Sequence, residues 1–329
     1  MSTLLRESSA IALDITGDDA ERLRLVATAI GRGADVVDDV RWVARVRSAF
    51  EDTPSSLRRA IRSFRRNTGD NGVLLIRGLP VAAVGEVLGP TPNVEGSVQR
   101  NASVPAALLL LAASGLGDPV AFRPEKAGAL VQDVVPVPGK EEFQGNAGSV
   151  VLSFHNENAF HPHRPDYILL YCLRADHDGV AALRTACVRT FLPLLGADTR
   201  GTLFRPEYVT MAPPSFGPAA KWSGEPHAVL FGAPDDPEIR VDMAATRPQT
   251  PGGAAALAEL QDVFERAGTA VRLAPGDLAV VDNRTTVHGR SAFVPRYDGE
   301  DRWLQRTYVL ADLRRSRHHR PDDGHVLDH

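Results

Sequence analysis

"SFHNENAFHPHRP", residues 153–165, contains His155, Glu157 and two further histidines, and it raises the question of whether a metal ion binds here. In a β-strand, residues i and i+2 point to the same side, so His155 and Glu157 can both reach one ion if this stretch is a strand or a strand end. The chain has 10 His and 41 acidic residues among 329, and chance alone gives roughly one His-x-acid triplet in such a chain. The triplet is therefore weak evidence by itself.

Stronger evidence comes from two stretches much later in the chain. "VVDNRTTVHGRSAF" contains His288, preceded by an apolar stretch and followed by glycine, and "GEDRWLQRTYVL" contains Arg302 at the opening of another apolar strand. Two imidazoles and one carboxylate on one face of the metal are the ligand set of mononuclear Fe(II) oxygenases. An arginine at this point can hold the far carboxylate of a dicarboxylic co-substrate through two parallel hydrogen bonds.

Each of these residues also has a purely structural interpretation. Taken alone, His288 would be a hydrogen-bonding residue in a turn, and Arg302 would be a surface charge. His161 and His163 stand between prolines, which favours a solvated turn over a metal site. The C-terminal "RRSRHHRPDDGHVLDH", residues 314–329, contains four histidines and reads as a solvated tail.

Composition excludes several classes of protein. Hydrophobic residues make up 43% and the net charge is −4, so we expect a globular protein without a basic surface for nucleic acid. The longest apolar run, residues 104–113, is too short to span a membrane, and the N-terminus does not read as a signal peptide. The two cysteines, Cys172 and Cys187, are too few for a disulfide framework or a cysteine-based zinc site, which favours a cytoplasmic location.

Hydrophobic periodicity predicts helices in the first third of the chain and short strands afterwards. Apolar residues at helical spacing indicate helices at 18–30, 35–50, 54–67, 104–117 and 251–268, and a short strand is expected at 72–80. From about residue 127, short β-rich runs alternate with turn residues, which is typical of a sandwich or barrel. We expect one domain over residues 1–329. It would have a helical part at about 1–120, a jelly-roll core at about 121–315 and a lid at 211–226.

Several longer stretches resemble the clavaminate synthase-like branch of the Fe(II)/2-oxoglutarate dioxygenases, which uses Glu where most relatives use Asp. Within that branch the chain is most similar to the bacterial L-asparagine oxygenases, which hydroxylate the β-carbon of free asparagine. The stretches are "GSVQR", "RPEKAGALVQDVVPVPG", "FHNENAFHPHRPDYILLYCLRA", "VDNRTTVHGR" and "PRYDGEDRWLQRTYVLADLRRS".

The resemblance implies a mainly β protein with flanking helices, built on a double-stranded β-helix, or jelly roll. His155, Glu157 and His288 would hold Fe(II). The co-substrate 2-oxoglutarate would bind the iron and place its 5-carboxylate on Arg302, with a hydroxyl donor from Thr185, and O₂ would be the oxidant.

The resemblance also implies the residues that recognise a free amino acid. Glu125 and Asn146 would lie at its amino end, and Arg306 would pair with its α-carboxylate if the strand bends or turns there. Asp242 would accept a hydrogen bond from the carboxamide of asparagine and would repel aspartate. The structural interpretations are a surface salt bridge for Glu125, a turn cap for Asn146 and a strand-end charge for Asp242.

The sequence therefore predicts hydroxylation of the β-carbon of a free L-amino acid, with L-asparagine giving 3-hydroxyasparagine, succinate and CO₂. Three alternatives stay open. The first is the same chemistry on arginine, aspartate or a carrier-bound residue. The second is a jelly-roll binding protein without catalysis. The third is a zinc hydrolase, for which the Arg302 clamp would have no purpose.

Overall fold

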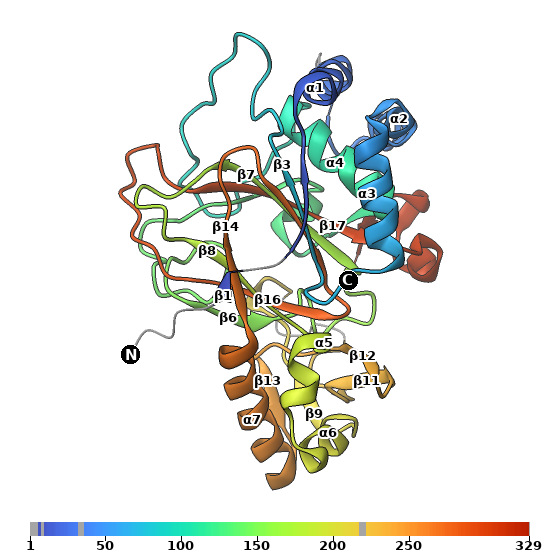
Figure 1. Ribbon diagram of the computed structural model, residues 1–329, viewed down its shortest axis with the longest axis vertical. Helices are drawn as coiled ribbons and strands as arrows, with labels where there is room; N and C mark the ends of the chain where they lie inside the picture. Colours follow the sequence, from blue (N-terminus) through green and yellow to red (C-terminus); the bar gives the residue numbers. More distant parts are fainter. Residues whose placement is uncertain (1–5, 8–9, 32–35, 217–221, 329) are drawn as a thin grey trace.

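The computed structural model describes residues 6–7, 10–31, 36–216 and 222–328 (Figure 1). The larger of its two main sheets has the strand order β18-β4-β17-β7-β15-β3-β2, and β5 also pairs with β17. These strands are β2 (Ile11–Asp14), β3 (Val73–Arg77), β4 (Asp118–Phe122), β5 (Gln132–Val134), β7 (Tyr167–Arg174), β15 (Leu278–Asp282), β17 (Trp303–Leu310) and β18 (Val326–Leu327).

The smaller main sheet has the order β1-β14-β8-β16-β6. Its strands are β1 (Arg6–Glu7), β6 (Leu152–His155), β8 (Ala182–Cys187), β14 (Thr269–Arg272) and β16 (Thr286–Arg290). Side chains from both sheets enclose a cavity between them. The protein is thus mainly β, with a jelly-roll core and flanking helices, as the sequence predicts.

Helices cover the outer face of the larger sheet. α4 (Val104–Leu116) packs on β17 and β7, and the helices α1 (Gly17–Gly31), α2 (Val40–Ala49) and α3 (Ser55–Arg66) pack on α4 (Figure 1). α4 is apolar nearly all round because it is buried on both sides. Its start is set by Ser103, whose hydroxyl accepts a hydrogen bond from the backbone N–H of Ala106 at 3.3 Å.

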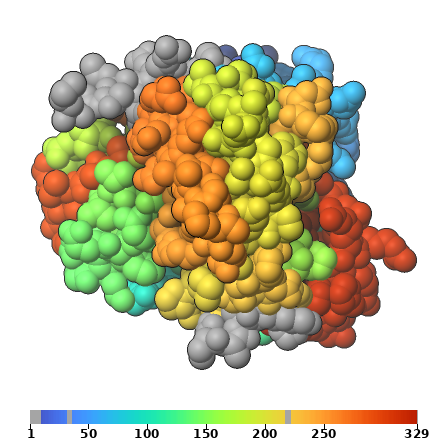
Figure 2. All heavy atoms as spheres, turned by 90° about the horizontal axis from the view of Figure 1, so that it is seen from below, coloured from blue at the N-terminus to red at the C-terminus, as the bar shows by residue number. Residues whose placement is uncertain are grey.

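A second group of helices and short strands lies below the smaller sheet in Figure 1. α7 (Pro251–Ala267) packs against α6 (Ala197–Leu203), and the two lie side by side on the face shown in Figure 2. α5 (Val188–Phe191) follows β8, and five short strands form two small sheets: β9 (Tyr208–Thr210), β10 (Pro226–His227), β11 (Leu230–Ala233), β12 (Asp236–Ile239) and β13 (Thr246–Pro248).

Most of the elements expected from periodicity are present. The predicted helices at 18–30, 54–67, 104–117 and 251–268 and the strand at 72–80 match α1, α3, α4, α7 and β3, while α2 begins later than the predicted 35–50. Among the short β-rich runs expected after residue 127, the run "IRVDM", residues 239–243, is not a strand for most of its length. β12 ends at Ile239, and Asp242 makes only an isolated bridge with His155. None of the described helices is long and apolar enough to span a membrane.

The predicted solvated turn is wrong at His161, and the predicted solvated tail is folded, although most of its charged residues are exposed. His161 is fully buried, with its ring 4.9 Å from that of Phe122, and His163 is half-buried. The C-terminal stretch folds into the 3₁₀-helix η5 (Leu313–His319), and the buried Arg320 donates hydrogen bonds to Leu313 O at 2.9 Å and Ser316 Oγ at 3.0 Å. Local composition failed here because each polar segment is covered by a part of the chain distant in sequence.

Candidate active site

The pairing of two strands brings His155 and His288 together. His155 is the last residue of β6, and it lies directly opposite His288 of β16 with the two ring centroids 4.3 Å apart. The glycine after His288 permits this pairing, because a Cβ on Gly289 would lie 2.5 Å from the carbonyl oxygen of Leu152 in β6. Gly289 is therefore required for the close packing of β16 against β6, in addition to the chemical role of His288.

Glu157 stands just beyond the end of β6, where two buried asparagines fix the backbone. Asn283 accepts from the backbone N–H of Glu157 at 2.9 Å and donates to the carbonyl of Pro165 at 2.8 Å. Asn156 donates to the carbonyl of Asn283 at 2.7 Å and accepts from the backbone N–H of Val241 at 3.0 Å. These bonds hold the backbone after β6 in one conformation, although it belongs to no helix or strand. The Glu157 carboxylate therefore keeps a fixed direction.

The three side chains form a set that fits a metal ion. Their ligand atoms all lie within 4.8 Å of one another, and His288 Nε2 is 3.7 Å from Glu157 Oε2. His155 Nδ1 lies 2.9 Å from the carbonyl oxygen of Ser153, so Nδ1–H donates there and Nε2 is left for a ligand. Two nitrogens and one carboxylate suit Fe(II).

Electrostatics keep this set in the protonation states that a metal requires. Burial lowers the pKa of His288 to about 4, which leaves a neutral imidazole near pH 7. Burial alone would raise the pKa of Glu157, but the Arg306 charge, followed by the nearby His288, outweighs it and holds that pKa well below its usual range. The carboxylate is therefore ionised at neutral pH.

Arg306 links the metal-ligand set to the neighbouring cavity wall. It is 3% exposed, and Nη1 donates to Glu157 Oε1 at 3.0 Å while Nη2 donates to Glu125 Oε1 and Gln132 Oε1 at 2.5 Å each. Burial would lower the pKa of Arg306, but the Glu157, Tyr308 and Glu125 groups overcome this and raise it. Arg306 needs no bend in β17 to line the same small cavity as Arg302, which stands one residue before that strand.

A small cavity of about 40 Å³ lies between the two sheets beside the metal-ligand set. Arg302 lines it with only 7% of the residue exposed, and it makes no hydrogen bond or ion pair with any of the described residues. Arg290 lines the same cavity. The other walls are largely apolar, formed by Val134, Leu152, Leu170, Leu183 and Leu304. A buried guanidinium without an acidic partner, at the end of an apolar cavity, fits a carboxylate ligand.

A much larger cavity of about 870 Å³ opens on the other side of the set, and His155, Glu157 and Asn146 line both cavities. Glu125 lines this larger cavity, accepts a hydrogen bond from Tyr308 Oη at 2.9 Å, and has a second, buried oxygen, Oε2, that accepts no hydrogen bond from the described residues. The amide of Asn146 faces Arg306, and its oxygen accepts from Nη1 and Nη2 at 3.0 Å each when it is the atom turned toward the guanidinium.

Asp242 also lines the larger cavity, close to His155, with which its backbone forms a bridge. Its Oδ1 accepts from the backbone N–H groups of Ala244 at 2.8 Å and Ala245 at 3.1 Å, so this oxygen caps a turn. Its Oδ2 makes no hydrogen bond with the described residues and is available to a ligand.

The structure does not bring Thr185 to either cavity. Thr185 lies opposite His288 in the sheet, but its hydroxyl shares a hydrogen bond of 3.1 Å with Thr269, and the neighbouring cavity wall is formed by Leu183. Sequence reasoning missed Arg290, Gln132 and Tyr308. Arg290 had a usable signal, since it stands two residues after His288 on the same strand and must share its face.

The fold and the site together define a non-heme iron dioxygenase of the 2-oxoglutarate-dependent class. Residues 209–308 match the model of the taurine catabolism dioxygenase TauD, TfdA family. The chain is 57% identical to an L-asparagine oxygenase of Streptomyces coelicolor over 95% of its own length and 94% of that protein. It is 34% identical to clavaminate synthase 2 of Streptomyces clavuligerus over 79% of this chain and 80% of that one.

A solved structure gives the same result at the level of the fold. The crystal structure of an asparagine oxygenase in complex with Fe(II), (2S,3S)-3-hydroxyasparagine and succinate superposes with a TM-score of 0.93 and 56% identity, covering 97% of this chain and 99% of that one. The chain belongs to the clavaminate synthase-like Fe(II)/2-oxoglutarate dioxygenases. It is an enzyme that uses Fe(II), 2-oxoglutarate and O₂.

Proposed function

We propose that this enzyme hydroxylates the β-carbon of free L-asparagine, giving 3-hydroxyasparagine with release of succinate and CO₂. The observation that carries the proposal is the pair of available carboxylate oxygens, Glu125 Oε2 and Asp242 Oδ2, on residues that line the large cavity beside the metal-ligand set. An ammonium group and a carboxamide N–H are the donors that such oxygens accept. The identity of 57% with an L-asparagine oxygenase supports the same substrate.

His155, Glu157 and His288 hold the iron in this proposal. Bound iron and 2-oxoglutarate, with O₂, supply the oxidising chemistry that places a hydroxyl on an unactivated carbon. The protein itself orients the metal ligands. Asn156 and Asn283 fix the Glu157 backbone, the Ser153 carbonyl orients the His155 ring, and Arg306 holds the outer oxygen of the Glu157 carboxylate.

Arg302 holds the 5-carboxylate of 2-oxoglutarate in the small cavity. The leucine and valine walls of that cavity contact the two methylene groups, and the keto acid end reaches His155, Glu157 and His288 at the shared boundary of the two cavities. Thr185 has no part in this proposal, because it lines neither cavity and its hydroxyl shares a hydrogen bond with Thr269.

The substrate's three polar groups each meet a partner, two of them in the large cavity and one at Arg306, which lines the small cavity beside Glu157. Its ammonium group lies at Glu125 and Asn146, its α-carboxylate at Arg306, and its carboxamide N–H at Asp242 Oδ2. Each group loses water on binding and therefore needs such a partner. Asp242 rejects aspartate, because two carboxylates would face each other there.

The lid and the division of the domain stay predictions. Met211, Pro213, Pro214 and Ser215 line the large cavity, which suits a segment that covers a bound substrate. Residues 217–221 of the predicted lid lie outside the described residues. The division into a helical part and a jelly-roll core is likewise a proposal, and the strands β2 and β3 join the core sheet from within the first 120 residues.

Succinate release across a panel of free amino acids tests the proposed function. With Fe(II) and 2-oxoglutarate present, asparagine should give the highest kcat/KM, and withholding Fe(II) should abolish the signal. The product should carry its new hydroxyl on the β-carbon, as determined by mass spectrometry and NMR. A higher kcat/KM for arginine or aspartate than for asparagine would overturn the substrate assignment.

A further inference from the structure

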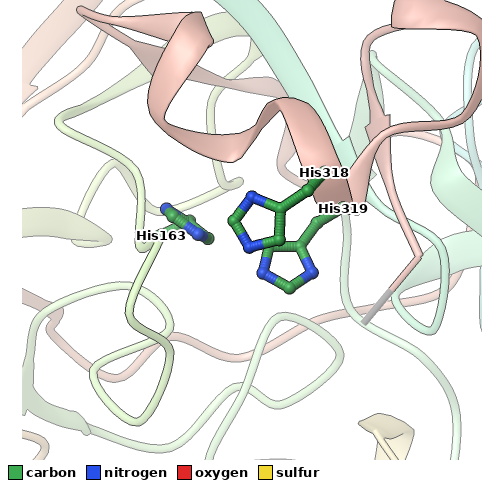
Figure 3. A group of neighbouring side chains, drawn as sticks. All are labelled: His163, His318 and His319. Carbon is green, nitrogen blue, oxygen red and sulfur yellow. The ribbon is translucent and has the colours of Figure 1, made fainter.

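A second group of histidines gathers outside both cavities. His163 comes from the turn that follows Glu157, and His318 and His319 come from the end of η5. Ligand nitrogens of the three rings lie within 4.8 Å of one another, and the centroid of the His319 ring is 5.1 Å from that of His163 and 3.8 Å from that of His318. Figure 3 shows His163 facing the other two rings across a small gap.

Both segments that carry these rings are fixed by their own hydrogen bonds. The backbone N–H of His163 donates to Nδ1 of the buried His161 at 2.9 Å, and the N–H of Arg164 donates to the carbonyl of His161 at 3.2 Å, which closes the turn. The buried Arg320 holds η5 through the carbonyl of Leu313. An ion that binds here therefore orders little additional backbone.

The ligand set is made of imidazole alone. His163 is half-buried, and a neutral imidazole ring has a lone pair to offer to a metal ion. The rings of His163 and His318 make no hydrogen bond or ion pair with the described residues. Imidazole ligands suit Zn²⁺, Ni²⁺ and Cu²⁺, whereas Mg²⁺ and Ca²⁺ require oxygen ligands.

The distances allow the three nitrogens to close on one ion. Zn–N bonds of about 2.0–2.1 Å place two tetrahedral ligands roughly 3.4 Å apart, and the present limit is 4.8 Å. His318 is exposed and can rotate to make up the difference. The same limit of 4.8 Å holds for His155, Glu157 and His288.

We propose that His163, His318 and His319 form a second metal site, separate from the iron site, that binds a divalent transition-metal ion such as Zn²⁺. Three protein ligands leave the fourth tetrahedral position for water. The ion would cross-link the turn after Glu157 to the C-terminal 3₁₀-helix. Because the set contains no carboxylate, it differs from the iron site in its preference for metals as well as in its place.

A third cluster provides the matched control. His177 lies 3.0 Å from Asp298 through Nε2 and 3.6 Å from Asp301 through Nδ1. The ligand atoms of His177, Asp298 and Asp301 also lie within 4.8 Å of one another, but both ring nitrogens of His177 already face carboxylates, and Asp301 accepts the backbone N–H groups of Arg296 and Tyr297, so this cluster ties loops together. Substituting His177 should therefore leave metal binding unchanged.

The test is the stoichiometry of Zn²⁺ bound to the full chain, measured by equilibrium dialysis and elemental analysis. The wild type should bind two ions. His155→Ala with His288→Ala should bind one, His163→Ala with His318→Ala should bind one, and the four substitutions together should bind none. His177→Asn should bind two. Circular dichroism should confirm that each variant is folded.

A thermal readout strengthens the test. In the His155→Ala, His288→Ala background, Zn²⁺ should raise the melting temperature, and adding His163→Ala and His318→Ala should remove that rise. Losing one ligand should weaken Zn²⁺ binding by at least about tenfold to a hundredfold, the loss seen when only outer partners are changed. The proposal is overturned if the His163, His318 variant retains two ions, or if His177→Asn loses one.

Discussion

The two cavities that meet at His155 and Glu157 are built differently. The small one lies between the two sheets, has mainly strand residues for walls, and contains Arg302, which has no acidic partner among the described residues. The large one is formed mainly by loops and carries available carboxylate oxygens. The first suits the co-substrate, which every member of the class uses, and the second suits the substrate, which differs between members.

This difference shows where each kind of recognition can be placed. A strand wall fixes side chains at two-residue spacing, as Arg302, Leu304 and Arg306 demonstrate. Loops vary in length and sequence at little cost to the core, so specificity can change there while the chemistry stays constant. Asp242 illustrates the loop case, since one of its oxygens holds a turn while the other is available to a ligand.

The largest effect should follow from a substitution in the metal-ligand set, where the two cavities meet. His155→Ala removes one of two nitrogen ligands, so turnover should be abolished and Fe(II) affinity should fall by more than about a hundredfold. Succinate release and Fe(II) titration measure these quantities. His177→Asn is the control and should keep wild-type turnover. Retention of Fe(II) affinity in His155→Ala would show that the iron site lies elsewhere.

The next largest effect should concern the large cavity alone. Asp242→Asn keeps Oδ1 for the turn and replaces the available oxygen by an N–H donor, which removes the repulsion of aspartate. The ratio of kcat/KM for asparagine to that for aspartate should fall by about a hundredfold, since a charge-assisted hydrogen bond contributes about 1.5–3 kcal/mol. The KM for 2-oxoglutarate should not change. An unaltered ratio would mean that Asp242 does not contact the substrate side chain.

A smaller effect should be confined to the small cavity. Arg302→Lys keeps the charge but loses the two parallel hydrogen bonds, so the KM for 2-oxoglutarate should rise by about tenfold or more, with the preference among amino acids unchanged. Arg290→Lys is the comparison, because Arg290 lines the same cavity. If Arg290→Lys raises that KM and Arg302→Lys does not, the clamp belongs to Arg290.

The smallest effect concerns how the wall of the large cavity responds to acid. His227 is buried, and its Nε2 shares a hydrogen bond of 2.8 Å with Thr210, which lines the cavity. Burial lowers the pKa of His227 from 6.5 to about 4. The unfolded chain therefore takes up this proton first, and the contribution of His227 to stability is present above pH 6.5 and lost as the pH falls toward 4.

His227→Gln should remove that part of the pH dependence. Between pH 7.5 and 5.5 the wild type should lose about 1.4 kcal/mol more unfolding free energy than the variant. Urea unfolding at the two pH values measures the difference. Equal losses in both proteins would show that His227 is not buried in its neutral form.

Sequence alone determined the chemistry at the centre of the site. The spacing of His155 and Glu157, a distal His288 and an arginine after it can be read from the sequence, and the resemblance to the dioxygenases implies their roles, although Glu157 lies just beyond the end of its strand. The same holds for α4, whose continuous apolar run and Ser103 cap are readable without a fold. Residues whose role follows from one strand or one helix could therefore be predicted.

Only the tertiary structure decided which distant groups meet. Arg306 is surrounded by Glu157, Glu125 and Gln132, which come from different parts of the chain, and the Thr185 hydroxyl is taken by Thr269. The histidines at 163, 318 and 319 come together only because η5 packs beside the turn after Glu157. Burial and charge pairing depend on neighbours across the fold, and no local pattern in the sequence encodes those neighbours.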